Sequence, residues 1–349
     1  MKYLLVFVFS IFGLLVLMSS QQQPTANFAP KAKLSEYGLF TGNLMEMRPS
    51  EGVIPYELNT PLFSDYAGKL RFVKLPPGTV VNYNDTEVFD FPVGTILVKT
   101  FYYTHDFRDE SKGRTLLETR LLIHEEKSWL ALPYVWNETQ TEAYLEVAGA
   151  EKPIQWKDLK GKKQGINYVI PNMNQCKGCH NRKEKLSPIG PSARQLHGEM
   201  TYADGVSNQL QKWKSRGMLV GLPENLKEVP RVPVWNDPQS GDLNSRARAY
   251  LDINCAHCHR PDGPANTSGL FLQVHEENPT ALGIQKTPVA AGRGSGGLNF
   301  DIVPGNPDAS ILLYRMNSHD PGVMMPELGR QLIHQEGVAL IREWIQSLK

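Results

Sequence analysis

Two copies of one short pattern, C-x-x-C-H, constrain this chain more than any other feature of its sequence. The copies are Cys176-Lys177-Gly178-Cys179-His180 and Cys255-Ala256-His257-Cys258-His259. The chain has 349 residues and four cysteines, and the two copies contain all four. Each cysteine pair and its histidine are therefore better interpreted as one chemical unit than as thiols that happen to lie close together.

The spacing of the two cysteines suits the attachment of haem. On a helical turn, residues three apart lie on one face, so both sulfurs can bond the two vinyl groups at one edge of a porphyrin. The following histidine is then held beneath the ring, where its imidazole can bind the iron as an axial ligand. We therefore predict two covalently attached haem c groups. The residues that hold them are Cys176, Cys179 and His180 for the first, and Cys255, Cys258 and His259 for the second.

Zinc and disulfides are the two rival uses of these cysteines. Zinc sites made from two C-x-x-C pairs normally have about 15–20 residues between the pairs, whereas Cys179 and Cys255 lie much farther apart in the sequence. A disulfide between cysteines three apart is usually a redox-active element, and it would leave the two following histidines unexplained. The sequence favours haem over both.

The first twenty residues are typical of a secretory signal peptide. One lysine, Lys2, precedes an apolar run that is interrupted only by Ser10 and Gly13 and ends at Leu17. The run is slightly short for a membrane span of ~20 residues. We expect a periplasmic protein, with membrane association only if this segment stays uncleaved. Export agrees with haem, because thioether attachment is associated with the outer face of a bacterial membrane.

Composition excludes one class of partner and indicates a folded chain. The formal net charge of +1 gives no electrostatic footprint for nucleic acid. A hydrophobic content of 41% and a charged content of 21% are ordinary for a globular protein. The length allows two or three domains.

Residues 28–172 have the pattern of a β-rich domain. Runs at 70–75, 95–103, 114–123 and 129–136 are rich in β-branched, aromatic and other apolar residues, and turns with proline and glycine or with charged residues separate them. Strands at this spacing predict a sandwich or a small barrel. We interpret the region as a module that docks a partner or covers the first haem.

A basic stretch adjoins the first motif. Between residues 151 and 185, three acidic residues face nine basic ones, namely Lys152, Lys157, Lys160, Lys162, Lys163, Lys177, Arg182, Lys183 and Lys185. A positive collar at a haem edge would steer an acidic redox partner into productive encounters. An ordinary solvated surface explains the same residues equally well.

The sequence does not determine which residue is the sixth ligand of the first iron. Residues 188–196 and 326–332 share a weak repeat of Pro, Gly and Arg-Gln-Leu, and in that superposition Ser187 stands where Met325 stands in the second unit. The candidates are His197, Met200 and Met218, and a vacant or water-filled position is equally credible. Arg293 and Arg315 are candidate partners for haem propionates.

The second motif is set in a different order of elements. A proline-rich linker at 223–241 leads to a helix expected at 243–253, which delivers the chain into Cys255, and Met325-Pro326 precedes an amphipathic terminal helix. Over residues 242–349 this order resembles class I cytochrome c. That resemblance implies that Met325 donates its sulfur to the iron opposite His259. Met324 is the alternative, and both methionines can instead fill the core.

The whole chain resembles a largely uncharacterised family of bacterial dihaem c-type cytochromes. The expected fold class is α+β and multidomain, with a β-rich N-terminal domain at 28–172, a first haem-binding segment at 173–222, and a C-terminal all-α cytochrome c-like domain at 242–349. The expected function is single-electron transfer between redox partner proteins, and no catalytic residue is assigned. The alternative is a dihaem peroxidase with an open first haem, although no distal acid or base is identifiable in the sequence.

Overall fold

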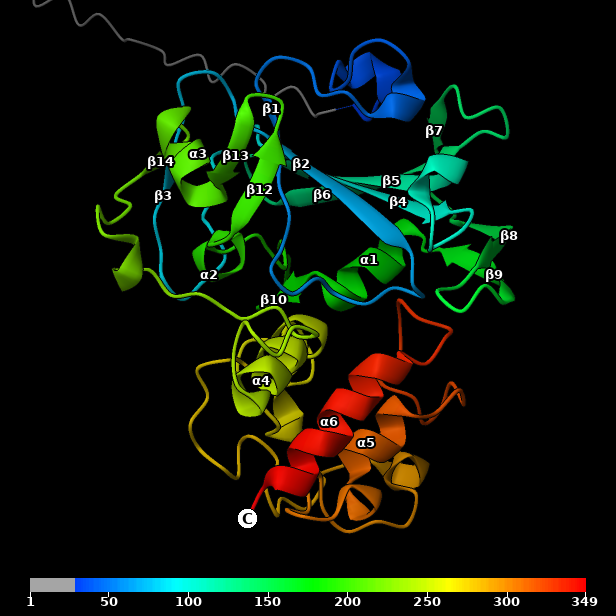
Figure 1. Ribbon diagram of the computed structural model, residues 1–349, viewed down its shortest axis with the longest axis vertical. Coiled ribbons are helices and arrows are strands. Elements are labelled where there is room, and N and C mark those ends of the chain that lie inside the picture. The colour runs from blue at the N-terminus through cyan, green and yellow to red at the C-terminus, as the bar shows by residue number, and fades with distance from the viewer. Residues whose placement is uncertain (1–28) are drawn as a thin grey trace, which may run out of the picture. The chain divides into compact units, whose positions relative to one another are not determined.

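Alternating apolar and polar residues in the first half of the chain produce one antiparallel sheet. The computed structural model describes residues 29–349, so the predicted signal peptide lies outside the described residues. The strand order is β1-β2-β4-β5-β6-β7, shown in Figure 1. The strands are β1 (Val53–Pro55), β2 (Gly68–Lys74), β4 (Ile96–Thr104), β5 (Arg114–His124), β6 (Trp129–Trp136) and β7 (Ala143–Leu145).

Smaller pairs of strands surround this sheet. The hairpin β8 (Ala150–Lys157) with β9 (Lys163–Ile170) packs on β4, and β3 (Val81–Asn82) pairs in parallel with β14 (Leu219–Val220). Two further hairpins are β10 (Asn181–Arg182) with β11 (Lys185–Leu186), and β12 (Glu199–Tyr202) with β13 (Gly205–Asn208). Within the described chain the main sheet is open, with β1 and β7 at its edges, and does not close into a barrel.

Helices are short and few in the described residues. The α-helices are α1 (Met173–Cys179), α2 (Ala193–Leu196), α3 (Gln209–Ser215), α4 (Leu243–Asn254), α5 (Ile311–Met316) and α6 (Gln335–Ser347). The 3-10 helices are η1 (Leu34–Tyr37), η2 (Leu44–Glu46), η3 (Glu110–Lys112), η4 (Leu226–Glu228), η5 (Asn266–Ser268), η6 (Gly292–Ser295) and η7 (Pro307–Ala309). No helix in this part of the chain has the length and apolar character needed to cross a lipid bilayer.

The expected fold class is wrong, because no all-α cytochrome c-like domain forms at residues 242–349. α4, α5 and α6 have 12, 6 and 13 residues, and turns, 3-10 helices and irregular segments make up most of the chain between α4 and α6. Glycine and proline are frequent in this part of the sequence and disfavour longer helices. The protein is instead a β-rich fold whose last third adds three helices.

Three hydrophobic clusters organise the packing around the motifs. One covers a face of the sheet and includes Leu34, Val98, Leu121 and Tyr134. A second, built from aromatic residues such as Phe101, Tyr103, Trp156 and Tyr168, fills the space between the sheet and the β8–β9 hairpin. A third joins the three C-terminal helices through residues that include Leu251, Leu313, Ile341 and Trp344.

A short segment before β2 joins the β-rich region to the C-terminal third. The Asp65 carboxylate accepts hydrogen bonds from the backbone N–H groups of Gln331 and Leu332, each at 2.7 Å. The backbone N–H of Phe63 donates to the Asn254 side chain at 2.8 Å. Residues 31–349 accordingly pack as one unit, and the segment that carries Met325 is positioned by the β-rich region.

Replacing Asp65 with Ala is expected to destabilise the fold by roughly 2–4 kcal/mol, because two backbone donors lose their charged acceptor where little water can replace it. Urea unfolding followed by tryptophan fluorescence measures the change. The exposed Asp90, for which the structure gives no side-chain partner, supplies the control Asp90→Ala. Equal midpoints for the two variants would contradict the role given to Asp65.

Candidate functional site

The first motif lies on α1, a helix of two turns. Asn172 caps it, since its side chain accepts from the backbone N–H of Gln175 at 2.9 Å while the Gln175 side chain accepts from the backbone N–H of Asn172 at 2.9 Å. The helix ends where the backbone N–H of His180 donates to the Cys176 carbonyl. Both thiols of the motif therefore belong to one helical turn, as the sequence spacing predicts.

The second motif begins where α4 ends. Asp242 caps this helix by accepting from the backbone N–H of Ser245 at 2.7 Å, as expected from the sequence. Beyond Asn254 the chain continues in tight turns, in which the backbone N–H of His259 donates to the Cys255 carbonyl at 2.9 Å. The helix thus delivers the second pair of thiols at its C-terminal end.

Both motif histidines have a ring nitrogen turned toward a nearby oxygen. His180 Nδ1 lies 3.0 Å from the Ser187 carbonyl oxygen, and His259 Nδ1 lies 3.4 Å from the Ser268 hydroxyl. Burial lowers the pKa of His180 to about 3 and that of His259 to about 4, so both rings are neutral near pH 7. A neutral imidazole whose Nδ1 is engaged leaves Nε2 for a metal, which is the usual arrangement of a histidine ligand.

One cavity borders both motifs. Its volume, including open space at its mouth, is about 1430 Å³. From the motifs it is lined by Cys176, Cys179, His180, Cys255 and His257, whereas Cys258 and His259 do not line it. Met325 also lines it, whereas Met324 is buried and does not. Of the two methionines, only Met325 has access to a group bound in this space.

The opposite wall of the cavity comes from the sheet and carries residues that the sequence analysis did not select. Lys99 on β4 and Arg120 on β5 line it together with Phe101 and Tyr168. Arg120 forms a bidentate ion pair with Glu118, at 2.6 and 2.7 Å. The sequence did contain a signal for this wall. Lys99 and Arg120 are cationic residues within predicted strands that are otherwise largely apolar.

The two motifs touch each other. Cys258 Sγ lies 3.9 Å from the Gly178 carbonyl oxygen. The backbone N–H of Lys183 donates to the Asp262 carbonyl at 3.0 Å, just beyond the two motifs. A Cβ at Gly178 would come within 2.9 Å of Leu328 Cδ1, which is the end of an exposed side chain that can shift. Groups attached to the two motifs would therefore be neighbours.

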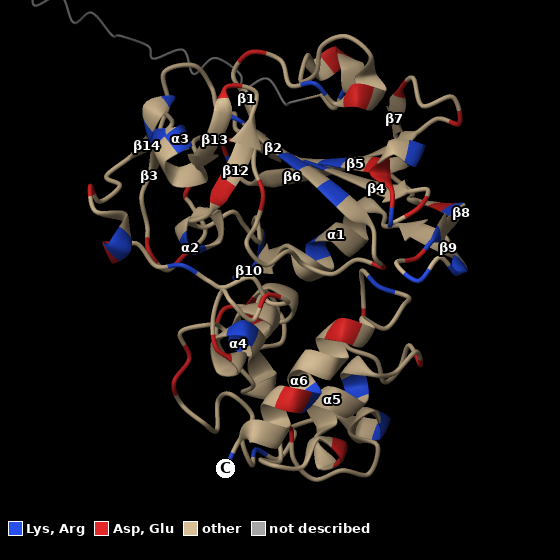
Figure 2. Ribbon diagram, in the orientation of Figure 1, with Lys and Arg blue, Asp and Glu red and all other residues tan. Residues whose placement is uncertain are grey.

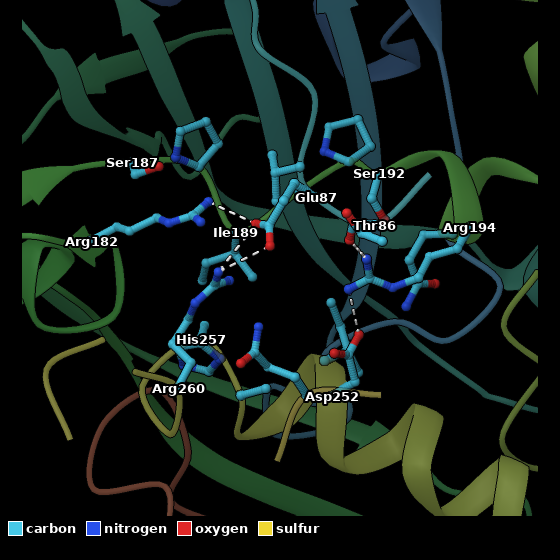
Figure 3. A pocket seen from close by; sticks show the side chains of 18 of the residues that line it. Thr86, Glu87, Arg182, Ser187, Ile189, Ser192, Arg194, Asp252, His257 and Arg260 are labelled. Carbon is cyan, nitrogen blue, oxygen red and sulfur yellow. Dashed lines mark hydrogen bonds and ion pairs between the residues drawn. The ribbon is translucent and has the colours of Figure 1, made fainter. Parts of the chain in front are cut away.

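Ion pairs with one residue of the β-rich region hold this contact, as Figure 3 shows. Glu87 accepts from Arg182 at 2.8 Å and from Arg260 at 3.1 Å, so it joins the segments that follow the first and second motifs. Asp262 pairs with the same two arginines, at 2.6 and 2.5 Å. Burial acts to raise the pKa of Glu87, but Arg260 and Arg182 outweigh it and lower that pKa.

The residues considered for the sixth position of the first iron lie elsewhere. His197 Nδ1 lies 3.1 Å from the Val229 carbonyl oxygen. Met200 is on β12 and borders a different cavity, and Met218 is buried in the hydrophobic cluster around Trp213. None of the three lines the cavity that contains His180.

Other sequence candidates also lie outside the cavity lining. Arg293 pairs with Asp320 at 2.7 Å, and Arg315 donates to the Val323 carbonyl at 2.8 Å. The Arg315 charge acts to lower the pKa of His259, so this side chain lies near the second motif, and the pairing of both arginines with propionates stays a prediction. Several lysines of the basic collar belong to the β8–β9 hairpin, where Figure 2 shows basic positions in blue. Exposed ones there are Lys157, Lys160, Lys162 and Lys163.

Neither the comparisons with known proteins nor the arrangement of metal-binding side chains assigns a cofactor to this chain. Family models, curated proteins and solved structures gave no match to this chain. The four cysteines form no disulfide with one another. In residues 29–349, no group of three or more His, Cys, Asp or Glu side chains is arranged to hold a metal ion.

Replacing Glu87 with Gln is expected to lower stability at pH 7 by roughly 1–2 kcal/mol, since partly solvated charged hydrogen bonds are lost. The pKa of Glu87 is depressed in the folded chain. Its contribution is therefore complete above the unfolded glutamate pKa of about 4.3 and is lost as the pH falls below it. Urea midpoints of both proteins, measured from pH 7 downward, should converge in acid. A constant difference would contradict this assignment.

Proposed function

We propose that this chain is a dihaem c-type cytochrome that transfers single electrons between redox partner proteins. The observation that carries the proposal is the shared cavity, which is bordered by thiols of both C-x-x-C-H motifs and by Met325. The two neutral histidines with engaged Nδ1 atoms support it further. Bound haem would supply reversible one-electron chemistry at its iron.

The chain's own residues have distinct tasks in this proposal. Cys176 with Cys179, and Cys255 with Cys258, fix the groups by thioether bonds. His180 and His259 would each bind an iron through Nε2, and the oxygen near each Nδ1 would orient the ring. Met325 would supply a thioether ligand. Phe63, Phe101 and Leu328 line the cavity and limit the access of water.

Contact between the motifs supports transfer from one group to the other. The 3.9 Å approach of Cys258 Sγ to the Gly178 carbonyl brings the two attachment points together. The clamp made by Glu87 with Arg182 and Arg260 keeps that approach fixed during a redox cycle. An electron accepted at one site then has a short path to the other, without movement of the chain.

The proposal includes a location for the protein and a surface for its redox partner. Residues 1–20 would direct the chain to the periplasm, where an uncleaved segment would tether it to the membrane. The exposed lysines of the β8–β9 hairpin would guide an acidic face of a redox partner toward the first motif. No role in binding nucleic acid is proposed.

A second candidate function is peroxidase-like reduction at the first haem. It is favoured by one observation, which is that His197, Met200 and Met218 all lie outside the cavity. With Met325 assigned to the second haem, none of these three side chains would reach an iron held by His180, and peroxide could bind there. Reducing hydrogen peroxide to two waters consumes two protons and two electrons, and the second haem and its redox partner would deliver those electrons.

The number of haems per chain tests the proposal directly. Protein matured in a host competent for cytochrome assembly should contain two haems by pyridine haemochrome analysis, and its mass should exceed the polypeptide mass accordingly. The variants Cys176→Ser/Cys179→Ser and Cys255→Ser/Cys258→Ser should each keep one haem. A colourless protein of unmodified mass would overturn the proposal.

Met325→Ala is expected to abolish the methionine-to-iron charge-transfer band and to lower one of the two reduction potentials, because a thioether ligand stabilises the reduced iron. Absorption spectra and a potentiometric titration measure both effects. Met324→Ala is the matched control, since that side chain is buried away from the cavity lining. Identical spectra for Met325→Ala and the parent protein would exclude Met325 as a ligand.

Spectroscopy separates the two candidate functions. If the protein is a peroxidase, its spectrum should show a high-spin ferric signal that changes when hydrogen peroxide is added, and the protein should turn over hydrogen peroxide. Electron transfer alone is expected to give two low-spin, six-coordinate haems without turnover. Electron paramagnetic resonance combined with a peroxide assay on the same sample decides between them.

A further inference from the structure

A row of three cations crosses the sheet beside the first motif. In the strand register Arg71 of β2 is opposite Lys99 of β4, and Lys99 is opposite Arg120 of β5. Directly opposed residues of neighbouring strands project from the same face, so these side chains are direct neighbours. Like charges at such positions destabilise a sheet unless something compensates them.

Only one of the three cations has an acidic partner within ion-pair distance in the described residues. Arg120 is paired with Glu118, whose carboxylate also accepts from the Tyr168 hydroxyl at 2.8 Å. For Arg71 and Lys99, the described part of the chain offers no acidic partner within ion-pair distance. Lys99 instead lies over the Phe101 ring, with Nζ 5.2 Å from the ring centroid. The acidic groups that act on them, Glu57 on Arg71 and Glu118 on Lys99, form no direct ion pair with either side chain in the described residues.

Two members of this row face the cavity of the first motif, whereas Arg71 borders a different cavity. Lys99 and Arg120 line the same space as Cys179 and His180. Burial lowers the pKa of Lys99 to about 7, and the positive charges of Arg120 and Arg71 act in the same direction. A negative group entering the cavity would restore the ammonium form and relieve the repulsion along the row.

We propose that Lys99, flanked by Arg71 and Arg120, holds a carboxylate in the cavity beside the first motif. The inference rests on the proposed function, because haem bound to Cys176 and Cys179 would form the facing wall. The carboxylate has two sources: a propionate of the bound haem, or a free small carboxylate near the iron. Arg293 and Arg315, which were expected to hold propionates, do not line this space.

Ammonium and guanidinium groups suit this ligand for a physical reason. Charge-assisted hydrogen bonds to a carboxylate are about twice as strong as neutral ones. A lysine already desolvated by the cavity loses little further hydration when the anion arrives. Glu118 accepts two of the five N–H groups of Arg120, whereas no hydrogen bond to an acceptor is seen for the Lys99 ammonium in the described residues, so Lys99 has all its hydrogens to donate.

The test uses the haem-loaded protein and three variants. Lys99→Met removes the charge and keeps the length of the side chain, and Lys99→Arg restores the charge. Lys177→Met removes a lysine from an exposed position of the same motif and serves as the control. Pyridine haemochrome analysis of each sample comes first, because a chain without haem overturns the proposed function itself.

Two measurements on loaded protein then identify the source of the carboxylate. For a free ligand, sodium formate should raise the urea midpoint of the parent, Lys99→Arg and Lys177→Met proteins, relative to sodium chloride at equal ionic strength. Its apparent affinity should fall at least about tenfold in Lys99→Met. For a haem propionate, formate should have no effect, and the propionate bending mode in the resonance Raman spectrum should shift in Lys99→Met alone.

The inference is overturned if a protein with two haems shows neither response. It is also overturned if Lys99→Arg behaves like Lys99→Met, because the shape of the side chain rather than its charge would then be responsible. An equal change in Lys177→Met would show that general loss of charge near the motif explains the data, and would likewise overturn it.

Discussion

The structure depends on the short segment that precedes β2, where the Asp65 carboxylate binds two backbone N–H groups of the C-terminal third. Two peptide donors that meet one charged acceptor away from bulk water form a strong and directional contact. Phe63 reinforces it, since its ring stacks on His334 with centroids 4.2 Å apart. Without this contact the sheet would not face Met325, and the cavity would lose one wall.

The local features of the site could be predicted from the sequence, because they depend on nearby residues. The helical turn that carries Cys176 and Cys179 follows from their spacing, and the Asp242 cap of α4 follows from its position before an apolar run. The same reasoning predicted strands at 70–75, 95–103, 114–123 and 129–136, and β2, β4, β5 and β6 lie there. Short-range patterns carry this information directly.

Long-range features could not be predicted in this way. The all-α cytochrome c-like domain was inferred from the order of elements, but order does not determine how much chain between them is helical. Glu87 joins segments 95 and more residues farther along the chain, and its sequence surroundings resemble any polar turn. The Arg71, Lys99 and Arg120 row required the strand register, which sets residues opposite one another only after the sheet has formed.

The contact between Cys258 and Gly178 also has a consequence for biogenesis. If groups are bonded to these sulfurs as proposed, a group on Cys258 would have to be accommodated between two segments that already touch. Attachment at the second motif would then be easier before the C-terminal third docks on the β-rich region than after it. The order of attachment and docking would thus become part of how the protein assembles.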